Sequence, residues 1–232
     1  MKTPLDEWGY MKKSTVKQVP MIADRIKEPS DQSCVDMLEV LPEEDAIYYS
    51  EEMNVIDKNG KSEQLFKEIE EQYGFIGGTK EEYLKYLHRP DVQYLWKWDT
   101  MDNIKAVAGV STVLKKNQHD QRKLIMQCAA NYAFQDPRDR ADLGMGGGGA
   151  LCRLRVDSDH IATSACDEDT AFTYVKVPEW MSAWQAGPPV QASEVVTLLP
   201  ERVKCRLNSL SDFVAMLDWL WAVHIQFISS CE

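Results

Sequence analysis

Residues 161–180, IATSACDEDTAFTYVKVPEW, are the part of the chain that decides its predicted fold. An apolar run from Ile161 ends at the carboxylate of Asp167, and a second apolar run closes at Pro178. A buried strand that presents a carboxylate at its exposed end is a common way to hold a metal ion near a substrate. An aromatic ring a few residues later, here Phe172, can lie against that substrate. The stretch therefore predicts a strand that ends in a metal-binding and substrate-binding turn. The three acids at 167–169 also fit an ordinary helix N-terminus, where carboxylates complement exposed amides.

The charge of the chain is unevenly distributed. Hydrophobic residues make up 44% of the 232 positions, which is enough for a packed core. The net charge of −11 argues against a simple nucleic-acid binder. Residues 1–100 carry 13 basic and 21 acidic side chains, 101–206 carry 13 of each, and 207–232 carry three acids and no Lys or Arg. A neutral middle with local clusters of bases can still meet a phosphate backbone.

The cysteine pattern and the hydropathy limit the cellular compartments in which we expect the protein. The six cysteines have no paired spacing, and no secretory leader is visible at the start. We therefore expect an intracellular protein, nuclear or cytoplasmic. No apolar run reaches the roughly 18 residues of a membrane-spanning helix, so we expect no membrane association.

The first hundred residues divide into two predicted segments. Prolines and acidic clusters predict an irregular, loosely packed acidic lead-in over 1–60. Helical spacing of apolar residues predicts a helical segment over 61–100. Within it, Thr79 and Glu82 form a capping-box signature for one helix, and Pro90 can begin a short third helix that carries Trp96. The aromatic side chains of this segment could form a base-stacking platform, but their spacing is more typical of a core.

A basic β-hairpin is predicted between residues 107 and 128. Two β-prone segments, 107–114 and 123–128, flank a polar turn at 117–120. The tip and flanks carry four bases: Lys115, Lys116, Arg122 and Lys123. Fixed positive charge with several donors suits a triphosphate or a template backbone, although a solvated hairpin tip explains the same charges.

The hairpin and the Asp-x-x-x-Ala-Phe sequence of residues 167–172, taken in this order, resemble the fingers hairpin and the first catalytic motif of reverse transcriptases. The resemblance covers about residues 100–200. It implies an α+β fold, with a fingers hairpin and a partial palm sheet packed with helices over 101–206. The family is an RNA-directed DNA polymerase, a nucleotidyltransferase of retrotransposons, that uses Mg²⁺ and binds an RNA or DNA template-primer and deoxynucleotides.

The resemblance also implies roles for single residues. The matching aspartate binds both magnesium ions, the matching arginine contacts the triphosphate, and the matching aromatic ring lies under the sugar and rejects a 2′-hydroxyl. On this chain these roles fall to Asp167, Arg122 and Phe172. Lys115 and Lys116 match the basic strand before the turn, and the backbone of Glu168, Asp169, Thr170 and Ala171 would seat the triphosphate.

Other motifs leave alternatives open. Gly144, Gly146 and Gly149 satisfy G-x-G-x-x-G, but the charged residues before them do not predict the buried strand that a dinucleotide site needs, so a flexible connector is favoured. The turn at 157–160 could hold a metal through two aspartates and His160, but such turns are usually solvated. Unpaired cysteine spacing gives no support for a zinc site.

The end of the chain lacks the second half of a polymerase site. Two-metal transfer needs carboxylates from two places, and no Tyr-x-Asp-Asp follows Asp167. Residues 207–232 predict an apolar C-terminal helix with Ser211 as its cap, a possible contact for a protein partner. We therefore expect a truncated reverse-transcriptase-like protein with little or no activity. A non-catalytic nucleic-acid-binding module and a protein-interaction module are the alternatives.

Overall fold

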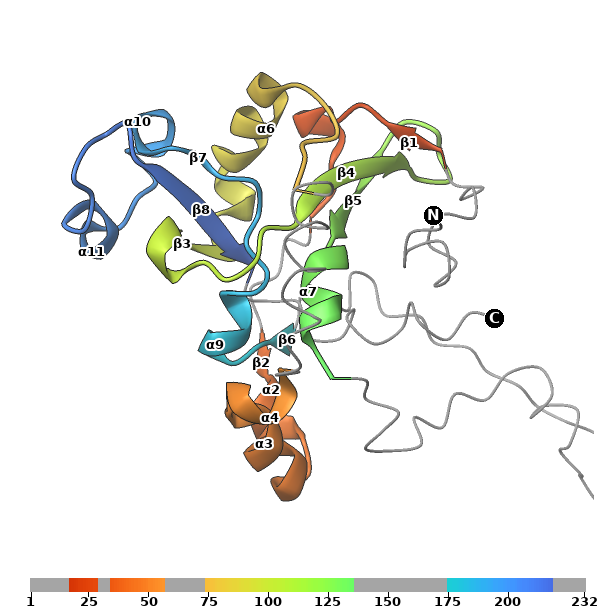
Figure 1. Cartoon of the computed structure of the whole chain (residues 1–232). Helices are drawn as coiled ribbons and strands as arrows, with labels where there is room; N and C mark the ends of the chain where they lie inside the picture. Colours follow the sequence, from red (N-terminus) through yellow and green to blue (C-terminus); the bar gives the residue numbers. More distant parts are fainter. Residues whose placement is uncertain (1–16, 29–33, 57–73, 136–174, 219–232) are drawn as a thin grey trace, which may run out of the picture.

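Three small sheets and a set of short helices make up residues 17–28, 34–56, 74–135 and 175–218, which are the residues that the computed structural model describes (Figure 1). This mixed composition agrees with the predicted α+β class. The strands are β1 (Gln18–Val19), β2 (Val35–Asp36), β3 (Trp96–Thr100), β4 (Gly109–Leu114), β5 (Gln121–Met126), β6 (Val175–Lys176), β7 (Val190–Gln191) and β8 (Phe213–Asp218). The α-helices are α2 (Met37–Val40), α3 (Glu43–Ser50), α4 (Glu52–Val55), α6 (Lys80–Leu87), α7 (Cys128–Ala133), α9 (Glu179–Ser182), α10 (Ala192–Val195) and α11 (Glu201–Lys204), and the 3-10 turns are η1 (Ala23–Arg25), η2 (Pro90–Val92) and η3 (Met101–Asn103).

The predicted hairpin is confirmed as strands β4 and β5. They pair antiparallel from Gly109 opposite Met126 to Leu114 opposite Gln121. Strand β1 adds to the other side of β4, which gives an antiparallel sheet in the order β1-β4-β5. The second sheet pairs β2 with β6 in parallel. The β-branched residues of β4 suit its central position, because they pack well on a pleated surface that is covered.

The described part of the predicted C-terminal helix is a strand. Residues 213–218 form β8, the central strand of an antiparallel sheet in the order β3-β8-β7, and Ser211 lies in the turn before it. Strand β8 pairs with β3 from Asp218 opposite Trp96 to Val214 opposite Thr100. Residues 219–232 of that predicted helix lie outside the described residues.

The reason for the strand is burial on both of its faces. Val214 and Met216 belong to the main core, whereas Ala215 and Leu217 pack against Ala186 on the other side. A strand buried on both faces gives a continuous apolar run, and periodicity alone does not distinguish such a run from a buried helix. The pairing with β3 decides the conformation.

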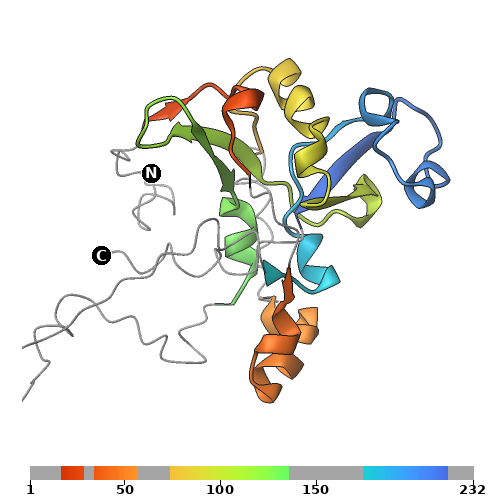
Figure 2. The same cartoon turned by 180° about the vertical axis from the view of Figure 1, so that it is seen from behind.

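Helix α6 lies between the two three-stranded sheets, as both views of the fold show (Figures 1 and 2). The hydroxyl of its N-cap, Thr79, accepts a hydrogen bond from the amide of Glu82 at 3.3 Å, as the capping-box signature predicts. The Glu82 carboxylate instead accepts from the Ala23 amide at 2.6 Å. Tyr83, Tyr86 and Leu87 are fully buried, at the i, i+3, i+4 spacing of one helix face. The prediction that the aromatic side chains of this segment form a core is confirmed for Tyr83 and Trp96.

Two other predictions of local structure need correction. The lead-in is helical over much of its described length, because α2, α3 and α4 occupy most of residues 37–55. The helix predicted from Pro90 is only the 3-10 turn η2, and Trp96 already begins β3. Residues 61–73 of the predicted helical segment lie outside the described residues. Within the described ranges, no helix has the length and apolarity needed to cross a membrane.

Candidate functional site

The hairpin β4–β5 places its bases on two different faces. Arg122 is exposed, as is Lys116 at the tip, and Lys115 is half-buried. Lys123, the next residue in the strand, has a side chain that is only 6% exposed. Neighbouring residues of a strand point to opposite faces of the sheet, so the adjacent pair of bases is divided between solvent and interior.

Local hydrogen bonds fix the tip of the hairpin. The Lys115 amide donates to the Asp120 carbonyl at 2.7 Å, and the Asn117 side-chain oxygen accepts from the amides of His119 and Asp120 at 3.1 and 2.9 Å. Gln118 has a φ of 57°, in the left-handed region that residues other than glycine adopt uncommonly. Hydrogen bonds from His119 and Asn117 hold the pKa of Asp120 below its usual range. The tip is therefore an ordered turn that presents Lys116 beside it.

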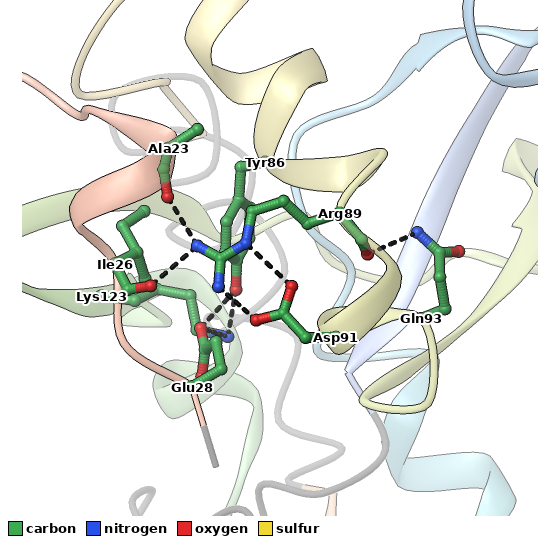
Figure 3. A network of polar contacts seen from close by, with 8 residues as sticks. All are labelled: Ala23, Ile26, Glu28, Tyr86, Arg89, Asp91, Gln93 and Lys123. Carbon is green, nitrogen blue, oxygen red and sulfur yellow. Dashed lines mark hydrogen bonds and ion pairs between the residues drawn. The ribbon is translucent and has the colours of Figure 1, made fainter. Parts of the chain in front are cut away.

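The buried lysine meets the Glu28 carboxylate and the Tyr86 side chain (Figure 3), and it also lies near the Trp96 ring. Its ammonium lies 3.1 Å from Oε1 of Glu28, whose side chain is 5% exposed, and it donates to the Tyr86 hydroxyl at 3.0 Å. The Tyr86 hydroxyl in turn donates to the same Glu28 oxygen. The ammonium also lies 5.5 Å from the centroid of the Trp96 ring, within the range of a cation–π contact. We call Glu28, Tyr86 and Lys123 the buried triad.

Arg89 ties the segment before Glu28 to helix α6. One guanidinium nitrogen donates to the carbonyls of Ala23 and Ile26 at 2.5 and 2.7 Å. The other two donate to both carboxylate oxygens of Asp91, a bidentate pair. The guanidinium also lies 5.6 Å from the Tyr86 ring centroid. Because these contacts join residues 23–28 to α6, they hold Glu28 in place for Lys123.

The Arg89–Asp91 pair predicts a sensitivity to acid. The hydrogen bond from Arg89 holds the pKa of Asp91 below its ordinary value of 3.8. Since the unfolded chain takes up the proton first as pH falls, the stabilisation is complete above pH 4 or so and is lost as pH falls through the folded pKa. Urea unfolding across this range should show a smaller loss of stability on acidification for Asp91→Asn than for the unmodified chain. Equal losses for both chains would contradict the assignment.

Gln121, the first residue of β5, holds the turn end of the hairpin against the same early segment. Its side-chain oxygen accepts from the Ile22 amide at 2.8 Å and its nitrogen donates to the Pro20 carbonyl at 2.8 Å. This buried amide satisfies two backbone groups of an early segment that has no strand partner at those positions. Sequence reasoning did not find this contact or the buried triad, although the alternation of side chains along a strand signals that either Arg122 or Lys123 must point inward.

A second buried carboxylate, Asp99 of β3, has a structural role. Its Oδ1 accepts from the Thr100 amide at 2.8 Å, the Asn103 side chain at 2.9 Å and Arg206 at 3.0 Å. Two of these donors follow Asp99 closely in the chain and the third is the distant Arg206, and together they satisfy the oxygen that they share. Among the described residues, no group of three or more His, Cys, Asp or Glu side chains is placed to hold a metal ion.

Of the predicted site, the structure describes the hairpin residues. Lys115, Lys116 and Arg122 lie on the hairpin, and Arg122 and Lys116 face solvent. Asp167, Phe172 and the intervening Glu168, Asp169, Thr170 and Ala171 lie outside the described residues, as do the glycine-rich stretch and His160. Comparison of the chain with protein-family models, with curated proteins and with solved structures finds no match in any of the three.

Proposed function

We propose that this chain is a reverse-transcriptase-like protein whose hairpin β4–β5 binds phosphate groups of a nucleic acid or a deoxynucleotide. One observation carries the proposal: an anchored hairpin presents Arg122 and Lys116 to solvent, while Lys123 is used internally. Exposed guanidinium and ammonium groups on an anchored hairpin are suited to phosphate, because the backbone that carries them is already ordered before binding.

The proposal does not extend to polymerisation by these 232 residues. By the resemblance, Asp167 would hold Mg²⁺, which steadies the triphosphate. In the family, carboxylates of a Tyr-x-Asp-Asp turn complete the set of ligands. Residues 168–232 contain no such sequence. Among the described residues, no cluster of three or more His, Cys, Asp or Glu side chains could hold a metal ion in its place. Two-metal transfer needs both sets, so we propose binding without RNA-directed DNA synthesis.

Charge reversal on the hairpin should weaken phosphate binding. Replacing both Lys116 and Arg122 with glutamate is expected to lower the affinity for a fluorescent single-stranded RNA or DNA by about tenfold or more, because two attractions become repulsions. Fluorescence anisotropy at about 50 and 200 mM salt measures both the affinity and its salt dependence, which should also become shallower.

Lys204→Glu is the matched control for this experiment. Lys204 is a base of helix α11, beside Glu201, and it belongs to a different sheet region from the hairpin. If Lys204→Glu weakens binding as much as the double replacement of Lys116 and Arg122 does, the attraction is a general charge effect and the hairpin is not the site. Affinity that is unchanged in the hairpin variant would refute the proposal directly.

Primer extension tests the catalytic half of the proposal. We expect no extension on an RNA template with Mg²⁺ and deoxynucleotides. Extension by the unmodified chain that disappears in Asp167→Ala would show that the residues form a working polymerase site and would overturn the non-catalytic assignment.

A further inference from the structure

Helices α2, α3 and α4 form an acidic lobe, defined here as residues 34–56. These residues include seven Asp and Glu side chains and no Lys or Arg. The lobe lies at the far end of the described fold from helix α6 and from the hairpin tip in both views (Figures 1 and 2). Its charge is therefore remote from the surface proposed to meet phosphate.

The lobe exposes large apolar side chains among these acids. Val40, Ile47 and Met53, one from each helix, are 61%, 62% and 62% exposed. Single exposed apolar residues are ordinary on a protein surface, but here each of three consecutive short helices presents one. Helix α3 has no fully buried residue; its Tyr49 packs against the small core cluster of Met37, Val177 and Met181, whereas Ile47 stays exposed.

Ile47 has acids on both sides along its helix. Glu43 and Glu44 lie one turn before it and are exposed, and Glu51 follows one turn after it at the helix end. Residues three and four positions apart are neighbours on a helix surface. The outer side of α3 therefore presents an apolar side chain between carboxylates.

Backbone and side-chain contacts hold the lobe to the rest of the fold. The indole of Trp180 donates to the Tyr49 carbonyl at 3.0 Å, and the Gln135 amide donates to the Val55 carbonyl at 2.8 Å. Glu52 turns inward, where it accepts from the Trp184 indole at 2.8 Å and from Lys105. Because the helices are anchored, their outer surface is already ordered and binding would cost little conformational entropy.

We propose that the acidic lobe is a docking surface for a basic amphipathic helix of a partner protein, and that Ile47 is one of its apolar contacts. Aliphatic side chains of the partner would cover the exposed apolar groups, and its Lys and Arg would pair with the surrounding carboxylates. Nucleic acid does not fit this surface, because its phosphates would meet carboxylates. A symmetric contact with a second copy is disfavoured too, since it would bring two acidic lobes together.

A model peptide tests the surface in the full chain. The probe is a fluorescent 18-residue helix of leucine and lysine with all leucines on one side. A second peptide of the same composition has its leucines spread around the helix. We expect the amphipathic peptide to bind, and Ile47→Gln to weaken that binding about tenfold through loss of apolar contact. The scrambled peptide should bind the unmodified chain about tenfold more weakly.

Leu210→Gln is the matched control. Leu210 is 55% exposed and lies in the turn before β8, outside the lobe, so its replacement should leave peptide affinity unchanged. Equal binding by Ile47→Gln and the unmodified chain, equal binding of the two peptides, or equal weakening by Leu210→Gln would each overturn the proposal. A concentration-dependent dimer in size-exclusion chromatography that Ile47→Gln abolishes would assign the surface to a second copy and would also overturn it. None of these measurements uses nucleic acid, so failure here is separate from failure of hairpin binding.

Discussion

Lys123→Met should lower the free energy of unfolding by about 3–5 kcal/mol, the usual cost of removing one member of a buried ion pair. Methionine keeps most of the side-chain volume but leaves the Glu28 carboxylate buried without its cation. The hydroxyl of Tyr86 still donates to that carboxylate, but one neutral donor does not replace an ammonium. Urea unfolding followed by circular dichroism measures the change.

Arg122→Met is the control for this prediction, because it makes the same replacement one residue earlier in the same strand. Arg122 is exposed, so we expect a change of no more than about 0.5 kcal/mol. Equal effects of the two substitutions would show that strand β5, rather than the buried triad, determines the loss. If Lys123→Met leaves the free energy of unfolding unchanged, the role of the ion pair is contradicted.

A double variant separates charge from packing. Glu28→Gln combined with Lys123→Met removes both buried charges, and the glutamine oxygen can still accept from the Tyr86 hydroxyl. We therefore expect the double variant to be more stable than Lys123→Met alone, with a coupling of roughly 1–3 kcal/mol in a double-mutant cycle. Additive losses would mean that the two side chains act independently.

The features that could be predicted from sequence are local ones. The hairpin follows from two β-prone runs around a polar turn, and helix α6 follows from the hydroxyl of Thr79 placed before an amphipathic segment. In both cases the determining residues lie within a few positions of one another. The burial of Tyr83 and Tyr86 also follows from helical spacing, which places them on one face.

The features that could not be predicted depend on distant partners. Strand β8 has the apolar run of a helix, and only its pairing with β3, more than a hundred residues earlier, makes it a strand. Helix α3 has no fully buried residue, so no apolar stripe marks it in the sequence. For the candidate site, the positive charges of the hairpin could be predicted from the sequence. The ion pair of Lys123 with Glu28 could not, because it forms only when residues 20–28 pack against β5.

Tyr83→Ala should cost about 3–5 kcal/mol of unfolding free energy, because it removes a large, fully buried ring from the core between the two three-stranded sheets. The ring hydroxyl donates to the Pro188 carbonyl at 3.1 Å, which joins helix α6 to the segment before β7. At the neighbouring Gly187, an added Cβ would lie 3.0 Å from the same hydroxyl oxygen and 2.7 Å from Cε of Met216. The backbone at Gly187 therefore lies close against this ring hydroxyl, and a side chain at that position would clash.

Tyr83→Phe resolves the two parts of this contribution. It keeps the ring and loses only the hydrogen bond, so a cost of about 1 kcal/mol is expected in urea unfolding at neutral pH. Burial raises the pKa of the Tyr83 hydroxyl, so the folded protein keeps it protonated when the unfolded chain begins to ionise. The hydroxyl's contribution is therefore complete below pH 10 or so and is lost as pH rises above it. The unmodified chain should lose more stability than Tyr83→Phe over that range, and parallel losses would show that this hydroxyl is not buried as described.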